Sequence, residues 1–214
     1  MDFIRNNVFS IITAIVAIIA IWQTHLQIRI SNKQFLFKER IDSYVIFKGL
    51  FDLYEENKNS FDYHKYKKKE PLMVDYLFEN LTNNSLLYEH TILIINLKNN
   101  NLKKEFLLKL ERIQGLSYRI KYLFKGKNGR MISDFIYSYQ EVLFEIYKYE
   151  LINDMIRNDS VPRKENWNYE DISKSYGEKA HRDRLFKSYE KINAIYKNII
   201  SNKVIDSIEK TISL

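Results

Sequence analysis

Residues 8–22 read VFSIITAIVAIIAIW and form the longest apolar run of the chain. It carries no charge, and its polar side chains, Ser10 and Thr13, can hydrogen-bond to the backbone of their own helix. With the uncharged flanks, residues 6–24 span about 28 Å as a helix, close to the ~30 Å of a bilayer's hydrocarbon core. We therefore predict an N-terminal transmembrane helix with Trp22 at the membrane interface.

Other interpretations of this stretch fit its residues less well. A cleaved signal peptide needs small residues at a cleavage site after the apolar run, but the run ends Ala20-Ile21-Trp22-Gln23. A buried core helix of a soluble protein, or an amphipathic helix on a membrane surface, needs a polar face. This run is apolar all round.

Lys and Arg residues are distributed unevenly about this stretch. Arg5 precedes it, whereas four basic residues follow it closely, namely Arg29, Lys33, Lys38 and Arg40. Basic residues favour the cytoplasmic side of a membrane. The distribution predicts a single-pass plasma-membrane protein with its N-terminus outside, an anchor over residues 1–24 and a cytoplasmic helical domain over residues 25–214.

The composition favours long helices, because the 214 residues include 2 Pro and 5 Gly. We see no alternation of period two that would predict strands. The predicted fold class is all-α, with one N-terminal transmembrane helix continuing into a long helix, followed by an antiparallel helical bundle. The absence of Cys excludes thiol nucleophiles and Cys-ligated metal centres. The net charge of +7 favours partners that carry phosphate, in nucleic acid or in anionic lipid.

Apolar residues at helical spacing define the expected elements. A helix is predicted over residues 23–57, followed by a polar break over residues 58–70. Further helices are predicted over residues 71–81, 85–97, 102–124, 131–157, 169–176 and 179–212. Gly126 and Gly177 are predicted to end two of these helices.

One apolar stripe along the first long helix repeats every seven residues, at Ile30, Phe37, Tyr44 and Phe51. Exposed stripes of this kind mark partner surfaces, and identical chains in one bilayer lie parallel. The stripe predicts the coiled-coil seam of a homo-oligomer. In the alternative, the helix over residues 179–212 folds back and covers the stripe within one chain.

No catalytic motif emerges from the sequence. Glu178 and His181 have the Glu-x-x-His spacing of di-iron bundles, but such a site needs two copies and two further Glu. One copy occurs, so a solvated helix face is the preferred interpretation. The pattern of HEPN-type helical ribonucleases, Arg followed by four to six residues and then His, is absent, as are the P-loop and His-Glu-x-x-His patterns.

Three carboxylates share the helix predicted over residues 131–157, namely Glu141, Glu145 and Glu150. Neighbouring carboxylates can perform acid–base chemistry. Ion pairs with Lys148, or with Lys from a neighbouring helix, are the preferred interpretation. We accordingly predict no catalytic residue, no metal ligand and no cofactor, and we do not expect an enzyme.

The densest basic run contains Lys65, Lys67, Lys68 and Lys69, interleaved with Tyr63 and Tyr66. Basic residues with stacking aromatics can hold single-stranded nucleic acid, and they can also contact anionic headgroups. A solvated loop is the simplest interpretation. Lipid contact is the next choice, because the anchor already holds the domain near a bilayer.

Four segments carry a family resemblance. They read QIRISNKQFLFKERIDSYVIFKGLFDLYEEN (residues 27–57), LFENLTNNSLLYEH (77–90), FLLKLERIQGLSYRIKYLFKG (106–126) and DFIYSYQEVLFEIYKYE (134–150). Together they resemble a group of small single-span helical proteins from low-GC Gram-positive bacteria. Members begin with a hydrophobic segment followed by SNKQ-x-LF-x-x-R, which residues 31–40 match. The resemblance implies a bacterial plasma-membrane protein and no particular activity.

These observations favour a membrane-anchored, non-enzymatic interaction or scaffold protein on the cytoplasmic face. The expected partners are the lipid bilayer, a second copy of the chain and another protein, and nucleic acid is not expected. One alternative is a sensor or effector of phage defence, by analogy of architecture alone. A further alternative is a metal-dependent or nucleic-acid-processing enzyme.

Overall fold

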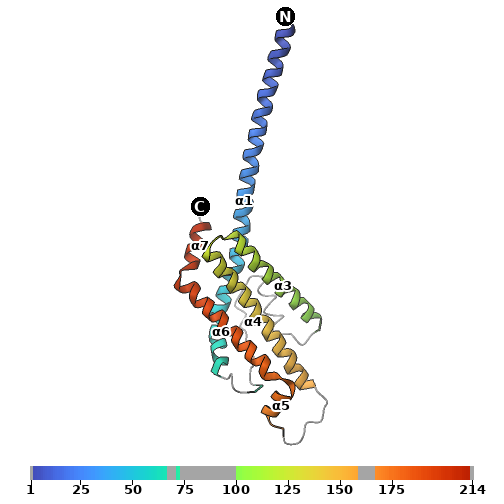
Figure 1. Ribbon diagram of the computed structural model, residues 1–214, viewed down its shortest axis with the longest axis vertical. Coiled ribbons are helices and arrows are strands. Elements are labelled where there is room, and N and C mark those ends of the chain that lie inside the picture. The colour runs from blue at the N-terminus through green and yellow to red at the C-terminus, as the bar shows by residue number, and fades with distance from the viewer. Residues whose placement is uncertain (1, 67–70, 73–99, 159–166, 213–214) are drawn as a thin grey trace. The chain divides into compact units, whose positions relative to one another are not determined.

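The computed structural model describes residues 2–66, 71–72, 100–158 and 167–212. Its elements are α1 (Asp2–Tyr66), α3 (Asn100–Leu123), α4 (Lys127–Asn158), α5 (Tyr169–Tyr176), α6 (Glu178–Ser201) and α7 (Val204–Ile212). The described residues contain helices and no strands, which confirms the predicted all-α class (Figure 1). The chain divides into two compact units, Met1–Ile41 and Asp42–Leu214.

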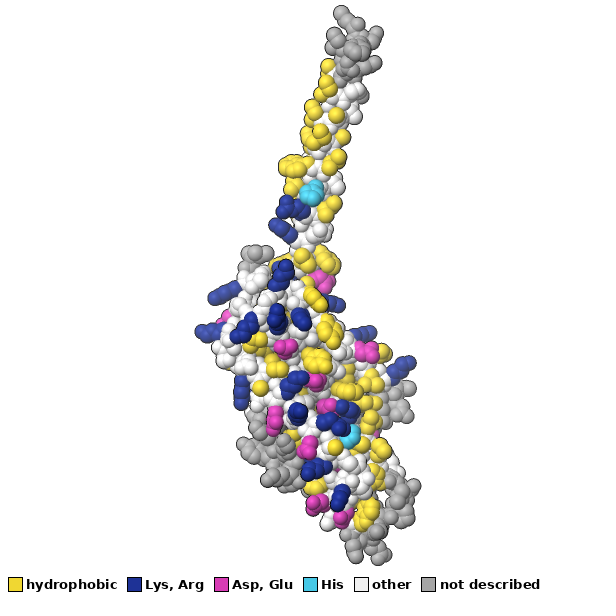
Figure 2. All heavy atoms as spheres, in the orientation of Figure 1, with side chains coloured by type: hydrophobic (Ala, Val, Ile, Leu, Met, Phe, Trp, Pro, Cys, Tyr) yellow, Lys and Arg dark blue, Asp and Glu magenta, His cyan; other side chains and the backbone are white. Residues whose placement is uncertain are grey.

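The first unit consists of the N-terminal part of α1. Its side chains from Ser10 to Trp22 are all exposed, and Figure 2 shows hydrophobic side chains along this segment. Among the described residues, α1 is the helix long and apolar enough to cross a bilayer, with a mean hydropathy of 1.8 over its most apolar 18 residues. A helix with the dimensions of a single-pass anchor is therefore present, as predicted. The unit ends at Ile41.

The second unit is built around α4, which packs against α3 and α6 (Figure 1). Phe47, Phe51 and Tyr54 of α1 add aromatic side chains to the same core. Phe51 packs on Phe135 of α4, with ring centroids 5.3 Å apart, and stacks on Tyr196 of α6 at 5.0 Å. The core is thus closed by segments from opposite ends of the chain.

The turn between α3 and α4 depends on two glycines. Gly126 has a φ of 93° and follows the end of α3, as the sequence predicted. A Cβ atom on Gly129 would lie 1.6 Å from the carbonyl oxygen of Phe124, so no larger residue fits without moving the backbone. The close approach lets α4 begin at Lys127, four residues earlier than the pattern of apolar residues indicates.

The first long helix extends beyond its predicted end. The sequence predicts a polar break over residues 58–70, but α1 continues to Tyr66. Asn57 does not end the helix, because its side-chain amide donates to the Leu53 carbonyl within the helix at 2.9 Å. No Pro or Gly interrupts residues 50–66. Of the predicted helix over residues 71–81, Pro71 and Leu72 are described and lie in a turn. The remainder of it, and the helix predicted over residues 85–97, lie outside the described residues.

The prediction of one helix over residues 179–212 is wrong. The structure ends α6 at Ser201 and starts α7 at Val204. The buried stripe of α6 contains Ile192, Tyr196 and Ile199, and its next positions in an unbroken helix would be Lys203 and Asp206. The break at Lys203, where φ is 49°, instead buries Val204 and Ile208.

Candidate functional site

The main polar feature of the second unit is a buried carboxylate, Glu178, at the start of α6. Its side chain has 0% exposure. The Tyr149 hydroxyl donates to Oε1 at 2.7 Å, and the Ser173 hydroxyl donates to Oε2 at 2.5 Å. The Leu72 amide also donates to Oε1, at 3.5 Å. The prediction of a solvated face at Glu178 is therefore wrong, because this carboxylate joins α4, α5 and α6.

A buried cation stands one helical turn after Glu178. Arg182 is 4% exposed, and its Nε lies 3.4 Å from Oε1 of Glu178. This ion pair offsets the cost of burying either charge alone. Burial raises the pKa of the nearby Tyr149 hydroxyl, and its hydrogen bond to Glu178 raises that pKa further. Tyr149 therefore stays protonated and acts as a hydrogen-bond donor.

The short helix α5 holds Ser173 against Glu178. Asn168 and Asp171 form a capping box, in which each side chain accepts a hydrogen bond from the other residue's backbone N–H. Gly177 ends α5 with a φ of 66°, a conformation that costs glycine little. Fixing both ends of α5 places Ser173 within one tight turn of Glu178. Tyr169–Tyr176 agrees with the predicted helix at both ends.

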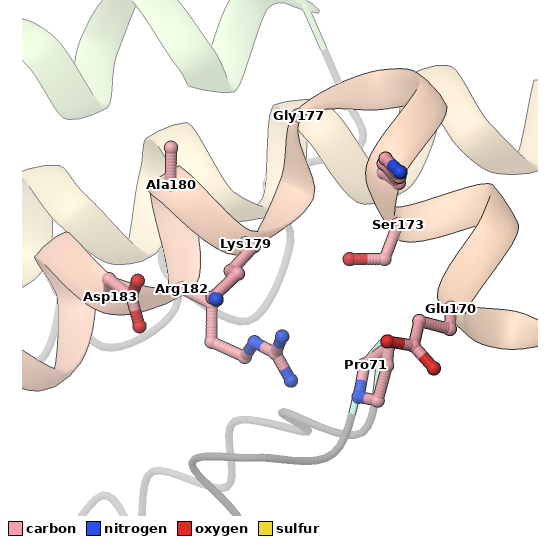
Figure 3. A pocket seen from close by; sticks show the side chains of 9 residues that line it. Pro71, Glu170, Ser173, Gly177, Lys179, Ala180, Arg182 and Asp183 are labelled. Carbon is pink, nitrogen blue, oxygen red and sulfur yellow. The ribbon is translucent and has the colours of Figure 1, made fainter.

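A cavity of about 670 Å³ lies beside this network. Its lining includes Glu170, Ser173, Lys174, Lys179, Arg182 and Asp183. Figure 3 shows the guanidinium of Arg182 extending from α6 toward Pro71 on the other side of the cavity. The volume lies within the range of small-molecule sites, roughly 300–1,000 Å³. The arrangement is suited to binding a polar molecule.

No protein family, curated protein or solved structure matches this chain. The resemblance to single-span proteins of Gram-positive bacteria stays a prediction. Function therefore has to be inferred from the chain's own residues.

The predicted oligomer seam divides into two parts. Ile30 and Phe37 are 55% and 38% exposed. Phe51 is 1% exposed within the core, and the Tyr44 hydroxyl donates to Oε1 of Glu209 in α7 at 2.5 Å. Tyr44 and Phe51 therefore take part in contacts within the chain. At these two residues the structure agrees with the alternative to the seam, in which the C-terminal helices fold back and cover the stripe within one chain.

The basic run lies largely outside the described residues. Lys67, Lys68 and Lys69 are not described, and Lys65 lies in the last turn of α1. Their predicted contact with lipid, nucleic acid or solvent stays a prediction.

Two of the candidate carboxylates form ion pairs. Glu141 pairs with Lys191 of α6, and Glu145 pairs with Lys148, as their spacing and charge indicate. The Nδ1 atom of His181 lies 3.0 Å from an Nη atom of Arg184. Within the described parts of the chain, no three His, Asp or Glu residues converge as metal ligands.

A signal for the buried pair was present in the sequence. The apolar stripe of α6 runs through Leu185, Tyr189 and Ile192, and the same 4-3-4 spacing extended toward the N-terminus reaches Arg182 and Glu178. Two opposite charges on the buried face predict an internal ion pair. The motif-based interpretation missed it because it considered the spacing of Glu178 to His181 and not the phase of the helix.

Proposed function

We propose that this protein is a single-pass membrane protein whose helical domain acts on the cytoplasmic face as a non-enzymatic interaction or scaffold module. The observation that carries the proposal is the uncovered apolar surface of α1 from Ser10 to Trp22. Ile18, Ile21 and Trp22 are each more than 60% exposed. Water disfavours a contiguous apolar surface of this length, whereas a bilayer stabilises it.

The proposed orientation follows from the basic side chains beyond this segment. Arg29, Lys33 and Lys38 are exposed. Anionic lipids of the cytoplasmic leaflet attract such residues by about 1 kcal/mol each near the surface. Retaining them on the inner side keeps the domain in the cytoplasm.

An interaction role is supported by apolar side chains that follow the span. Ile30, Phe35 and Phe37 are exposed on α1 beyond Trp22, where no lipid tails are expected to cover them. Exposed apolar surface of this kind marks contact with another protein. A second copy in the same bilayer is the simplest occupant, and a different protein is the other.

The test is fractionation of cells that express the full chain or a chain starting at residue 23. We expect the full chain to pellet with membranes and to resist carbonate, and the shorter chain to be released. A full chain recovered in the soluble fraction would contradict the anchor. Tyr122 is 78% exposed and gives the topology test when replaced by cysteine. An impermeant thiol reagent is expected to label Tyr122→Cys after permeabilisation and not in intact cells, and labelling of intact cells would reverse the orientation.

A further inference from the structure

The guanidinium of Arg182 has donors that the protein does not use. The side chain is 4% exposed, yet Nε and Nη1 have no hydrogen-bond acceptor among the described residues. A guanidinium carries five N–H donors in a planar fork, and buried donors without acceptors destabilise a fold. An acceptor supplied from outside the chain would remove that penalty.

Glu178 balances the charge of Arg182 but accepts no hydrogen bond from its Nε or Nη1. Its two oxygens already accept hydrogen bonds from Tyr149 and Ser173. The 3.4 Å contact to Nε does not have the geometry of a hydrogen bond. Glu178 therefore balances the charge and fixes the direction of the arginine, whose side chain still lines the cavity (Figure 3).

The charges around the cavity restrict the ligand. Lys174, Lys179 and Arg182 are positive, and Glu170 and Asp183 on the lining, with Glu178 behind it, are negative. Among the described residues, these three positive charges equal the three negative charges. A singly charged group can therefore pair with Arg182, whereas the further charges of a polyanion such as nucleic acid or a triphosphate would meet no excess of positive charge.

We propose that this cavity binds a small molecule through one phosphate or carboxylate group, held by the guanidinium of Arg182. Planar, paired donors of arginine match both groups. Lys179, exposed on the first turn of α6, adds attraction at the rim. The phosphate could belong to a soluble metabolite or to a lipid headgroup, since the recognition chemistry is the same.

The first experiment uses the full chain in neutral detergent micelles. Inorganic phosphate, acetate and tripolyphosphate are titrated at constant ionic strength set with NaCl, and the midpoint of thermal unfolding is followed. We expect phosphate or acetate to raise the midpoint saturably, and tripolyphosphate to do so less. The same titration in nanodiscs of phosphatidylglycerol and of phosphatidylcholine, without added phosphate, tests the lipid source. Stabilisation by phosphatidylglycerol alone would support a lipid ligand. No saturable effect in any arm up to about 100 mM anion would overturn the proposal.

Variants locate the site. Arg182→Lys keeps the charge and loses the fork, so the half-saturating anion concentration should rise about tenfold. Lys179→Gln should raise it roughly two- to fivefold. Lys187→Gln removes the same charge from an exposed position of α6 outside the cavity lining, and should leave it unchanged. If Arg182→Lys fails to fold, comparing the half-saturating anion concentrations of Lys179→Gln and Lys187→Gln still tests the site. Equal effects of these two substitutions would show general charge attraction and overturn the site, whatever the outcome of the membrane test.

Discussion

The Tyr149 hydroxyl of α4 donates a 2.7 Å hydrogen bond to Oε1 of Glu178 in α6, across 29 residues of sequence. Glu178 has no exposed surface, so its charge must be stabilised by this bond, by Ser173 and by Arg182. Three helices of the domain therefore meet at one carboxylate. The stability of the domain is expected to depend on that residue more than on any exposed acid.

The first prediction concerns the charge of Glu178. Glu178→Gln keeps the shape and leaves Arg182 as an uncompensated buried cation, so the free energy of unfolding should fall by about 3–5 kcal/mol. Asp183→Asn, an exposed change on the same helix, should alter it by less than about 0.5 kcal/mol. Urea unfolding of the full chain in detergent measures both.

A double variant tests the ion pair itself. Glu178→Gln with Arg182→Gln removes both charges, and it should cost less than the sum of the two single changes. If the losses in unfolding free energy were additive, the two side chains would act independently, which would contradict an ion pair at 3.4 Å.

The second prediction compares two glycines in helices. Gly129→Ala should lower the free energy of unfolding by about 1–3 kcal/mol or more, because the new Cβ would overlap the Phe124 carbonyl oxygen. Gly115→Ala in α3 meets no described atom within 4 Å, and should raise stability by up to about 1 kcal/mol through helix propensity. Denaturant midpoints measure the pair, and a neutral Gly129→Ala would mean that the α3–α4 turn is not held as closely as described.

The third prediction concerns self-association through α1. The chain contains no Cys, so single cysteines report without background. Ile30→Cys and Phe37→Cys should form disulfides between chains in oxidised membranes, because both positions are exposed. Phe51→Cys should not, because that position is buried within its own chain. Non-reducing electrophoresis gives the result. Failure of both exposed positions to cross-link would leave a different protein as the partner of this surface.

The fourth prediction concerns acid. Burial lowers the pKa of His181 from its ordinary 6.5, and the nearby Arg184 and Lys148 lower it further, although Glu145 and Glu178 act in the opposite direction. The unfolded chain then binds the proton more readily than the folded chain. This contribution to stability is complete above about pH 6.5, and is lost as the pH falls through the lower pKa of the folded state.

Urea unfolding between pH 7.5 and pH 5 measures this effect. Stability of the native protein should fall more steeply with acid than that of His181→Gln. If the unfolding free energies of the two proteins fell in parallel with pH, His181 would have the same pKa in the folded and unfolded states.

The sequence predicted those features that depend on local pattern. The apolar run at residues 8–22, the stripe from Phe106 to Phe124 and the stop at Gly177 each specify their element through neighbouring residues. Features that depend on distant partners were missed. The break at Lys203 lets Val204 and Ile208 face a core to which α4 contributes. No Pro or Gly near Lys203 predicts this break from the sequence. The burial of Glu178 follows from the phase of its own helix, but its partners Tyr149 and Ser173 lie on other helices, and no local pattern predicts them.

The hydrogen bond between Tyr44 and Glu209 has a consequence for biosynthesis. The two residues are 165 positions apart. At about 5–20 residues per second, a ribosome needs roughly 8–33 s to reach the second after the first. During that interval Tyr44 lacks its partner, and the cover of the aromatic segment around Phe47 and Phe51 is incomplete. A nascent chain tethered early by its first hydrophobic helix would keep this segment apart from other nascent chains, so early insertion would protect the domain from aggregation until its last helix is made.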